Sequence, residues 1–127
     1  MYLSACLGAA CAWTVYFHED FAAEFRTFPK DAKVALGEVI DRLRAEGPAL
    51  GRPHVDTLKG SRYPNMKEMR ASTSGDWYRL AFAFDPRQEA VVLCGGGKGG
   101  VDGDRFYVEL IRKADERYAV RLKELGL

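Results

Sequence analysis

The chain has 127 residues, a formal net charge of +1, 47% hydrophobic residues and 29% charged residues. These values are typical of one ordinary globular domain and exclude a disordered or fibrous chain. The three cysteines are irregularly spaced, and no Cys or His residues have metal-ligand spacing. We therefore expect no disulfide framework, no metal and no cofactor. We expect a reducing, cytoplasmic location. Positive charge gathers in residues 52–98, which carry 8 basic and 5 acidic side chains. A nucleic acid partner would bind there.

The first twelve residues differ from the rest, because they are uncharged and small or apolar. A secretory signal needs a basic segment and a longer apolar core, and residues 1–12 have neither. No segment approaches the length of a transmembrane helix, so no membrane partner is expected. We therefore expect a poorly ordered N-terminal extension over residues 1–12 and a single domain over residues 13–127.

The first half of the domain predicts a strand followed by two helices. Residues 13–17 are β-rich and alternate, which is typical of a strand. His18 is expected to cap a helix that ends at Pro29 and carries an apolar stripe of three phenylalanines, Phe21, Phe25 and Phe28. Asp31 is expected to be the N-cap of a second helix, which Gly47 and Pro48 end. Two short helices so closely connected form a helical hairpin.

The second half predicts a sheet and a final helix. Residues 48–65 form a connection rich in turn-forming residues, and a compact domain rarely keeps such a loop without a use for it. Strands are expected over residues 66–72, 77–84 and 89–94, and their short connections make them antiparallel. An amphipathic helix follows from about Asp104. The fold class is thus α+β in the order β-α-α-β-β-β-α, a small antiparallel sheet with the helical hairpin packed on one face and a C-terminal helix.

Alternation along the strands predicts a polar group on one face of the sheet. The even-numbered residues of 77–84 are bulky and should pack on the helices, which leaves Arg79 on the opposite face among small residues. In residues 66–72, Met69 as the core anchor would turn Glu68 and Arg70 the same way as Arg79. A carboxylate and two guanidiniums would then share one open face. The alternative is an exposed face with a plain cross-strand ion pair.

Other polar groups could extend this face. The glycine-rich residues 95–100 hold Lys98 but lack the P-loop pattern, so they indicate either a close approach to a ligand or a flexible turn. Cations interleaved with an aromatic suit an RNA backbone with a stacked base, or else a solvated loop. The residues that form this pattern are Lys59, Arg62, Tyr63 and Lys67, with His54 upstream. Tyr107 lies on the apolar stripe of the final helix, where a core tyrosine is the ordinary interpretation.

The sequence lacks the common hydrolase patterns, because it has no GxSxG or HExxH motif. RNA cleavage without a metal is compatible with it, since RNA carries its own nucleophile, the 2′-hydroxyl. The protein must align that group, help remove its proton and stabilise the phosphorane with fixed cations. Each well-placed cation lowers the activation barrier by on the order of 3 kcal/mol.

Three spaced motifs resemble HigB-like toxins of the RelE/ParE superfamily, the phage-derived host-toxicity proteins. Residues 58–70, LKGSRYPNMKEMR, resemble the central motif of that family, and residues 78–86, YRLAFAFDP, resemble the strand that follows it. Residues 96–98, GGK, resemble the end of its last strand. The resemblance covers about Trp13 to Leu122, and it implies a RelE-like fold.

The resemblance also implies a function. It implies the toxin of a type II toxin-antitoxin system, a metal-free endoribonuclease (mRNA interferase) that acts on messenger RNA at the ribosome and inhibits translation. The implied partner is a helix-turn-helix antitoxin, through which alone operator DNA is contacted. By motif, Arg79 resembles the arginine that faces the scissile phosphate, Arg70 and Lys98 resemble further cations, and Tyr107 lies where related toxins place an aromatic.

The chain departs from the better-known RelE pattern, which has lysines at the positions of Met66 and Glu68. The general base is therefore open, with Glu68 as the first candidate and His54 as the second. Two other functions are compatible with the same fold, namely non-enzymatic inhibition of DNA gyrase, as in ParE-type relatives, and RNA binding without cleavage.

Overall fold

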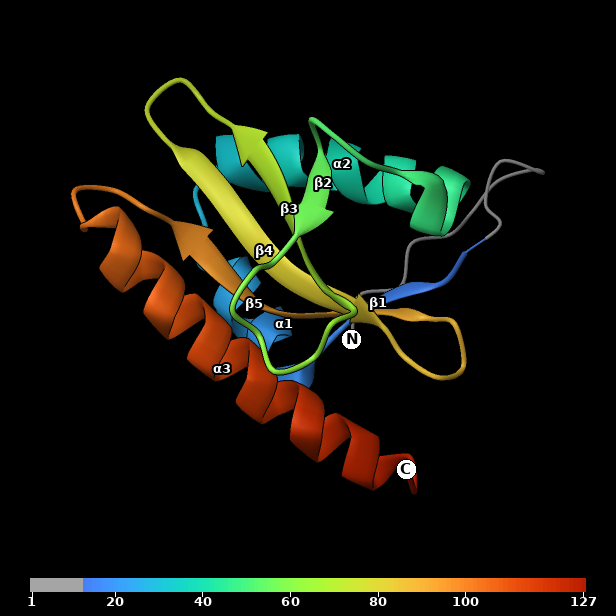
Figure 1. Cartoon of the computed structure of the whole chain (residues 1–127). Helices are drawn as coiled ribbons and strands as arrows, with labels where there is room; N and C mark the ends of the chain where they lie inside the picture. The colour runs from blue at the N-terminus through green and yellow to red at the C-terminus, as the bar shows by residue number, and fades with distance from the viewer. Residues whose placement is uncertain (1–12) are drawn as a thin grey trace.

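The computed structural model describes residues 13–127, and the expected extension over residues 1–12 lies outside them. One mixed sheet has the strand order β1-β5-β4-β3-β2 (Figure 1). Its strands are β1 (Val15–Phe17), β2 (Val55–Thr57), β3 (Met66–Ser72), β4 (Trp77–Phe84) and β5 (Ala90–Gly97). The helices are α1 (Glu19–Arg26), α2 (Lys30–Glu46) and α3 (Gly103–Glu124), with a short 3-10 helix η1 (Gly47–Ala49) after α2.

The α+β class is confirmed, but the expected element order and the purely antiparallel sheet are wrong. The connection over residues 48–65 contains β2, which pairs antiparallel with β3 at the sheet edge. β1 pairs parallel with β5 over residues 90–92. A strand of three residues alternates over too short a distance to be distinguished from its turn-forming neighbours. Whether two distant strands pair parallel or antiparallel cannot be predicted from either strand alone.

The helical hairpin forms much as its phenylalanine spacing predicts. The Nδ1 atom of His18 accepts a hydrogen bond from the Asp20 N–H, which confirms the expected cap. The ring centroids of Phe21 and Phe25 lie 5.8 Å apart, and those of Phe25 and Phe28 lie 5.4 Å apart. The expected N-cap at Asp31 is wrong, since α2 begins at Lys30 directly after Pro29. Pro29 occupies the N-cap position and its side chain cannot accept a hydrogen bond, so the helix starts without a side-chain cap.

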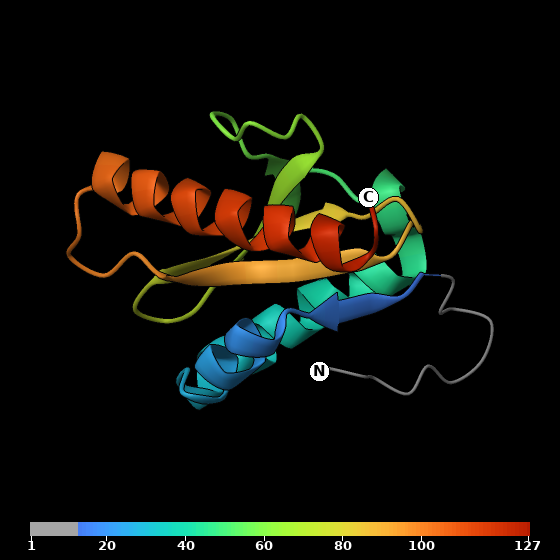
Figure 2. The same cartoon turned by 90° about the horizontal axis from the view of Figure 1, so that it is seen from below.

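The sheet is covered on both faces, as the view along its edge shows (Figure 2). One buried cluster joins α1 and α2 to β4 through Phe21, Leu36, Leu80 and Phe82. A second joins α3 to the other face through Ala81, Ala83, Leu110 and Ala114. Ala81 and Ala83 are 0% exposed, so the face expected to be open is covered by α3 along its middle. Small side chains let the apolar stripe of α3 approach the strands closely, and only the end of this face remains outside the helix contact.

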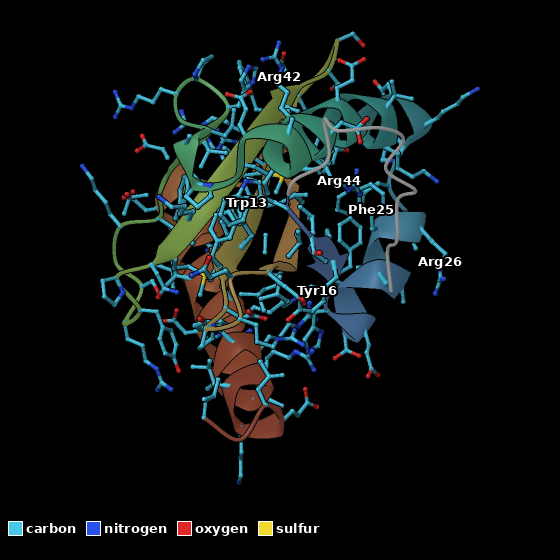
Figure 3. All side chains as sticks on the ribbon, turned by 90° about the vertical axis from the view of Figure 1, so that its right-hand side faces the viewer. Trp13, Tyr16, Phe25, Arg26, Arg42 and Arg44 are labelled. Atoms are coloured by element: carbon cyan, nitrogen blue, oxygen red, sulfur yellow. The ribbon has the colours of Figure 1, made fainter. Side chains whose placement is uncertain are left out.

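Side-chain pairs hold α3 in place along its length. The Arg117 guanidinium pairs with Glu24 of α1 at 2.6 Å and donates to the Leu93 carbonyl at 2.7 Å. Further along, Arg121 donates to the hydroxyl of Tyr16, which itself donates to the buried Asp85 carboxylate at 2.9 Å. Figure 3 shows Tyr16 between β1 and α3. No helix within residues 13–127 is long and apolar enough to cross a membrane.

Candidate functional site

Charged side chains from two central strands meet at one end of the sheet, beside the first turns of α3. Met69 packs in the cluster of α1 and α2, while Met66 packs against α3, so Glu68 and Arg70 share the α3 face. In the antiparallel ladder Arg70 stands directly opposite Arg79. The parity predicted for Glu68, Arg70 and Arg79 is therefore confirmed, although part of the face on which they lie is covered.

Glu68 connects the strands to α3. One oxygen of its carboxylate, Oε1, lies 3.1 Å from an Arg70 guanidinium nitrogen and accepts a hydrogen bond from the Tyr107 hydroxyl at 3.2 Å. Glu68 is only 5% exposed, so this carboxylate is shielded from solvent. A buried carboxylate with two donors orients both of them. Glu68 thus holds one arginine and one phenol of the site in fixed positions.

Tyr107 departs from the ordinary interpretation of a core tyrosine, because its hydroxyl reaches the polar cluster. Burial and the nearby Glu68 carboxylate raise the pKa of Tyr107, and the Arg79 guanidinium only partly opposes them. The phenol therefore keeps its proton throughout the neutral range. It can donate that proton in a hydrogen bond at physiological pH.

Arg79 lies against the aromatic side chains of α3 rather than against a carboxylate. Its guanidinium carbon is 5.8 Å from the ring centroid of Tyr107 and 5.9 Å from that of Phe106. Arg79 Nη1 donates to the Trp77 carbonyl at 3.4 Å. The buried Nε atoms of Arg70 and Arg79 have no hydrogen-bond partner within residues 13–127. A guanidinium that lies against aromatic rings and has no carboxylate partner within residues 13–127, as Arg79 does, favours an anionic ligand.

The end of β5 forms the floor beside Arg79. Gly96 pairs with Arg79 in the ladder, and a side chain built on Gly96 would meet no atom within 4 Å. Lys98 follows, and its ammonium would lie 3.5 Å from a Cβ placed on Gly103, the first residue of α3. Lys98 is therefore beside the start of the helix that carries Tyr107. The open space over Gly96 leaves room for a ligand next to the cations.

The strand β2, which the sequence does not reveal, adds a second carboxylate. Asp56 Oδ2 accepts from Arg70 Nη2 at 3.3 Å and from Arg52 Nε at 3.0 Å. A backbone hydrogen bond from Thr57, followed by these arginines, lowers the pKa of Asp56. The His54 carbonyl accepts from the Arg70 N–H at 2.9 Å, which puts the His54 backbone, in the turn just before β2, beside Arg70. His54 thus lies at the outer rim of the cluster.

The other residues predicted to bind RNA lie apart from this cluster. Ser61 and the Arg62 N–H both donate to Asp115 of α3, which docks the turn after β2 on the helix. The Tyr63 ring packs edge-on against Tyr118 at 4.8 Å. Residue 118 lies about 16 Å along the helix axis from residue 107. Lys59 is exposed on the same turn, whereas Lys67 alternates to the α2 side of the sheet, away from Glu68.

Three residues of the site were not singled out from the sequence, namely Asp56, Phe106 and Trp77. Phe106 precedes Tyr107 on a helix whose apolar stripe can be recognised in the sequence. Both rings contact Arg79 because of the direction in which this helix crosses the sheet. Trp77 shares the parity of Arg79, which was a usable signal.

Comparison with known proteins identifies the family of this chain. The family described as phage derived protein Gp49-like (DUF891) matches residues 23–119. Among curated proteins of Mycobacterium tuberculosis (strain ATCC 25618 / H37Rv), the candidate toxin HigB2 is 46% identical over 86 residues, 67% of this chain and 42% of HigB2. The candidate toxin HigB3 is 43% identical over 93 residues, 73% of this chain and 79% of HigB3. The chain therefore spans less than half of HigB2 but most of HigB3.

Two solved structures share the fold. The isolated Escherichia coli RelE toxin superposes with a TM-score of 0.56 at 20% identity, covering 80% of this chain and 97% of RelE. The archaeal RelE chain, crystallised with RelB from Pyrococcus horikoshii OT3, gives a TM-score of 0.52 at 18% identity, covering 71% of this chain and 99% of that one. At such identities these likenesses establish the fold alone. The family match and the HigB3 identity show that the chain belongs to the Gp49-like family, with HigB-type proteins among its relatives, and its fold is that of RelE.

Proposed function

We propose that this protein is the toxin of a type II toxin-antitoxin system and that it cuts messenger RNA at the ribosome without a metal. The observation that carries the proposal is the grouping of Arg70, Arg79, Glu68 and Tyr107 at one end of the sheet. Arg79, which has no carboxylate partner within residues 13–127, suits a phosphodiester, and the open space over Gly96 admits one. An RNA phosphodiester brings its own nucleophile, so no further reacting group is required of the protein.

In the proposed reaction the 2′-oxygen attacks the adjacent phosphorus, the bond to the 5′-oxygen breaks, and a 2′,3′-cyclic phosphate results. Arg79 and Arg70 stabilise the phosphorane charge, and Lys98 adds a third cation beside the start of α3. Preorganised donors cost no reorganisation as the charge develops, and Glu68 and the aromatic rings already hold the two arginines.

Proton removal runs through Tyr107 and Glu68 in this proposal. The shielded carboxylate of Glu68 has little direct access to substrate, but the Tyr107 hydroxyl already donates to it. As the 2′-hydroxyl gives its proton to the phenol oxygen, the phenol passes its own proton to Glu68. The leaving 5′-oxygen takes a proton from solvent at the mouth of the site. Glu68 is thus the terminal base, and His54, at the rim, is not required.

A partner antitoxin belongs to the same proposal. The P. horikoshii neighbour was crystallised as a RelE–RelB complex, and the similar fold supports a corresponding partner here. We expect a helix-turn-helix protein that inhibits the toxin and brings it to operator DNA. Expression of the toxin should arrest growth, and co-expression of a helix-turn-helix protein encoded beside it should restore growth.

Primer extension on translated messages after induction tests the proposed activity. Cuts inside codons are expected with the native protein and are expected to disappear with Arg79→Ala. Intact messages accompanied by altered DNA supercoiling would instead indicate gyrase inhibition. Messages that are bound but never cut would indicate an RNA-binding module.

A further inference from the structure

Trp77, the first residue of β4, presents an indole ring at the mouth of the candidate site. It is 50% exposed, which is a large apolar surface to leave in water. The next residue, Tyr78, packs against Phe28 on the α1 and α2 side, with ring centroids 5.4 Å apart. Because side chains alternate along a strand, Trp77 points to the other face, the face of Arg79.

The backbone of Trp77 is fixed from three directions. Its carbonyl accepts from Arg79 Nη1 and from the Lys98 N–H, each at 3.4 Å. Its N–H donates to Asp76 Oδ1 at 2.8 Å, and Asp76 Oδ2 accepts from the Gly99 N–H at 2.9 Å. Asp76 thereby ties the β3–β4 turn to the glycine-rich turn before α3, at the end of the molecule where both turns lie (Figures 1 and 2). The indole is therefore carried on a well-anchored strand end.

The ring itself is available to a ligand. Within residues 13–127 the indole makes no contact with another aromatic ring or with a cation. The hydrogen bonds that hold Trp77 all involve its backbone and not its ring. Arg79, two residues along the strand, lies about 7 Å away by strand rise. That is comparable to the separation between a phosphate and the base of its own nucleotide. An exposed ring at this spacing from a phosphate-binding arginine suits an unstacked base.

We propose that Trp77 stacks on a nucleobase next to the scissile phosphate and so positions the RNA strand for cleavage. This inference rests on the proposed function, because it assumes that Arg79 holds that phosphate. Single-stranded RNA is the partner that the surroundings favour, since Arg79 and Lys98 both contact the Trp77 backbone carbonyl and every base offers a π-face. A protein partner such as the antitoxin would be the occupant if cleavage by the free toxin did not depend on the ring.

The test uses ribosomes programmed with a short message that carries a single abasic nucleotide at each position flanking the cut in turn. Native protein, Trp77→Phe, Trp77→Leu and the matched exposed control Val34→Ala are compared by kcat/KM. Leu and Phe are both apolar, but only Phe keeps a face for stacking. On the intact message we expect Trp77→Leu to lose roughly 5- to 100-fold and Trp77→Phe to stay within about fivefold of native protein. Val34→Ala should equal native protein, because Val34 lies exposed on α2.

The abasic series identifies the stacked base. At one position, removal of the base should slow native protein to the rate of Trp77→Leu and should slow Trp77→Leu no further. Equal cleavage by Trp77→Leu and native protein would overturn the inference and leave the proposed function standing. The same conclusion would follow if removal of a base slowed both proteins by the same factor at every position. Failure of native protein to cut the intact message would overturn the proposed function and this inference with it. Equal melting temperatures of the two Trp77 variants and Val34→Ala would establish that all are folded.

Discussion

Arg70 and Arg79 stand directly opposite each other on β3 and β4, two like charges on one face of the sheet. Like charges in this arrangement are destabilising unless they are compensated. Arg70 is compensated by Glu68 and Asp56, whereas Arg79 has no carboxylate partner within residues 13–127 and lies against aromatic rings. The charge of Arg79 is therefore the one that remains for a ligand.

Replacement of Arg79 should greatly slow cleavage without loss of stability. We expect Arg79→Ala to lower kcat by about 100- to 1,000-fold, the usual loss for one preorganised donor. Arg79→Lys should fall between that variant and native protein, because an ammonium keeps the charge but not the fork of donors. The melting temperature should not fall, since the substitution removes the repulsion from Arg70. The measurements are single-turnover cleavage of ribosome-bound message and thermal unfolding.

The matched control for this prediction is Arg112→Ala. Arg112 pairs with Glu109 and Glu116 on the exposed side of α3, and exposed pairs of this kind contribute little to stability. Cleavage at the native rate is expected. Equal losses for Arg79→Ala and Arg112→Ala would show that general charge, rather than the site, matters.

Glu68 and Tyr107 should behave as one unit. Glu68→Gln and Tyr107→Phe each break the proton route through the phenol, so each should reduce kcat, and the double variant should be little slower than the worse single one. Glu68→Gln should also reduce the free energy of unfolding by about 1–3 kcal/mol, because Arg70 loses its buried partner. A double-mutant cycle on kcat and on stability checks both expectations. Fully additive losses in kcat would contradict the shared route.

Asp85 should contribute stability that depends on pH. Burial alone would raise the pKa of Asp85, but hydrogen bonds from Arg87, Tyr16 and the backbone lower it below its ordinary value of 3.8. A lowered native pKa contributes stability that is fully present above about pH 4 and is lost as the pH falls through the native pKa. Asp85→Asn should therefore be less stable by about 1–3 kcal/mol at neutral pH.

The pH dependence separates this effect from simple repacking. The difference in free energy of unfolding between native protein and Asp85→Asn should shrink below pH 4, as measured by urea titrations at several pH values. A difference that stays constant down to pH 2 would argue against the ionic contribution. Arg87→Ala, which removes the main donor to Asp85, should show the same narrowing in acid.

Arg62 should affect RNA affinity but not the chemical step. Its guanidinium stacks on Tyr63 at 4.9 Å from the ring centroid, on the turn docked against Asp115, well along α3 from Tyr107. Arg62→Ala would remove a phosphate contact there. The slope of the logarithm of the binding constant against the logarithm of the salt concentration should then become shallower by about 0.7 for single-stranded RNA. The measurement is the affinity for an RNA oligonucleotide with a 2′-deoxy nucleotide at the cut. Lys33→Ala on α2 should leave the slope unchanged, and a reduced kcat for Arg62→Ala would contradict the assignment.

The local pattern of the sequence was sufficient for much of the site. Strand alternation is a property of the backbone, so Arg79, Glu68 and Arg70 could be placed on one face as soon as Met69 was assigned to the core. The cap at His18 and the phenylalanine stripe of α1 follow equally from short-range geometry. The motifs over residues 58–70 and 78–86 already indicated the family, which the comparisons confirm.

The tertiary structure alone decided what surrounds those residues. Ala81 and Ala83 look like an open floor in sequence, yet α3 crosses them, and that crossing brings Tyr107 to Glu68 and Phe106 to Arg79. The pairing of β2 with β3 likewise brings Asp56 to Arg70. Periodicity determines which way a side chain points within its own element. Which distant element it meets depends on how whole apolar surfaces fit together, and no single segment contains that information.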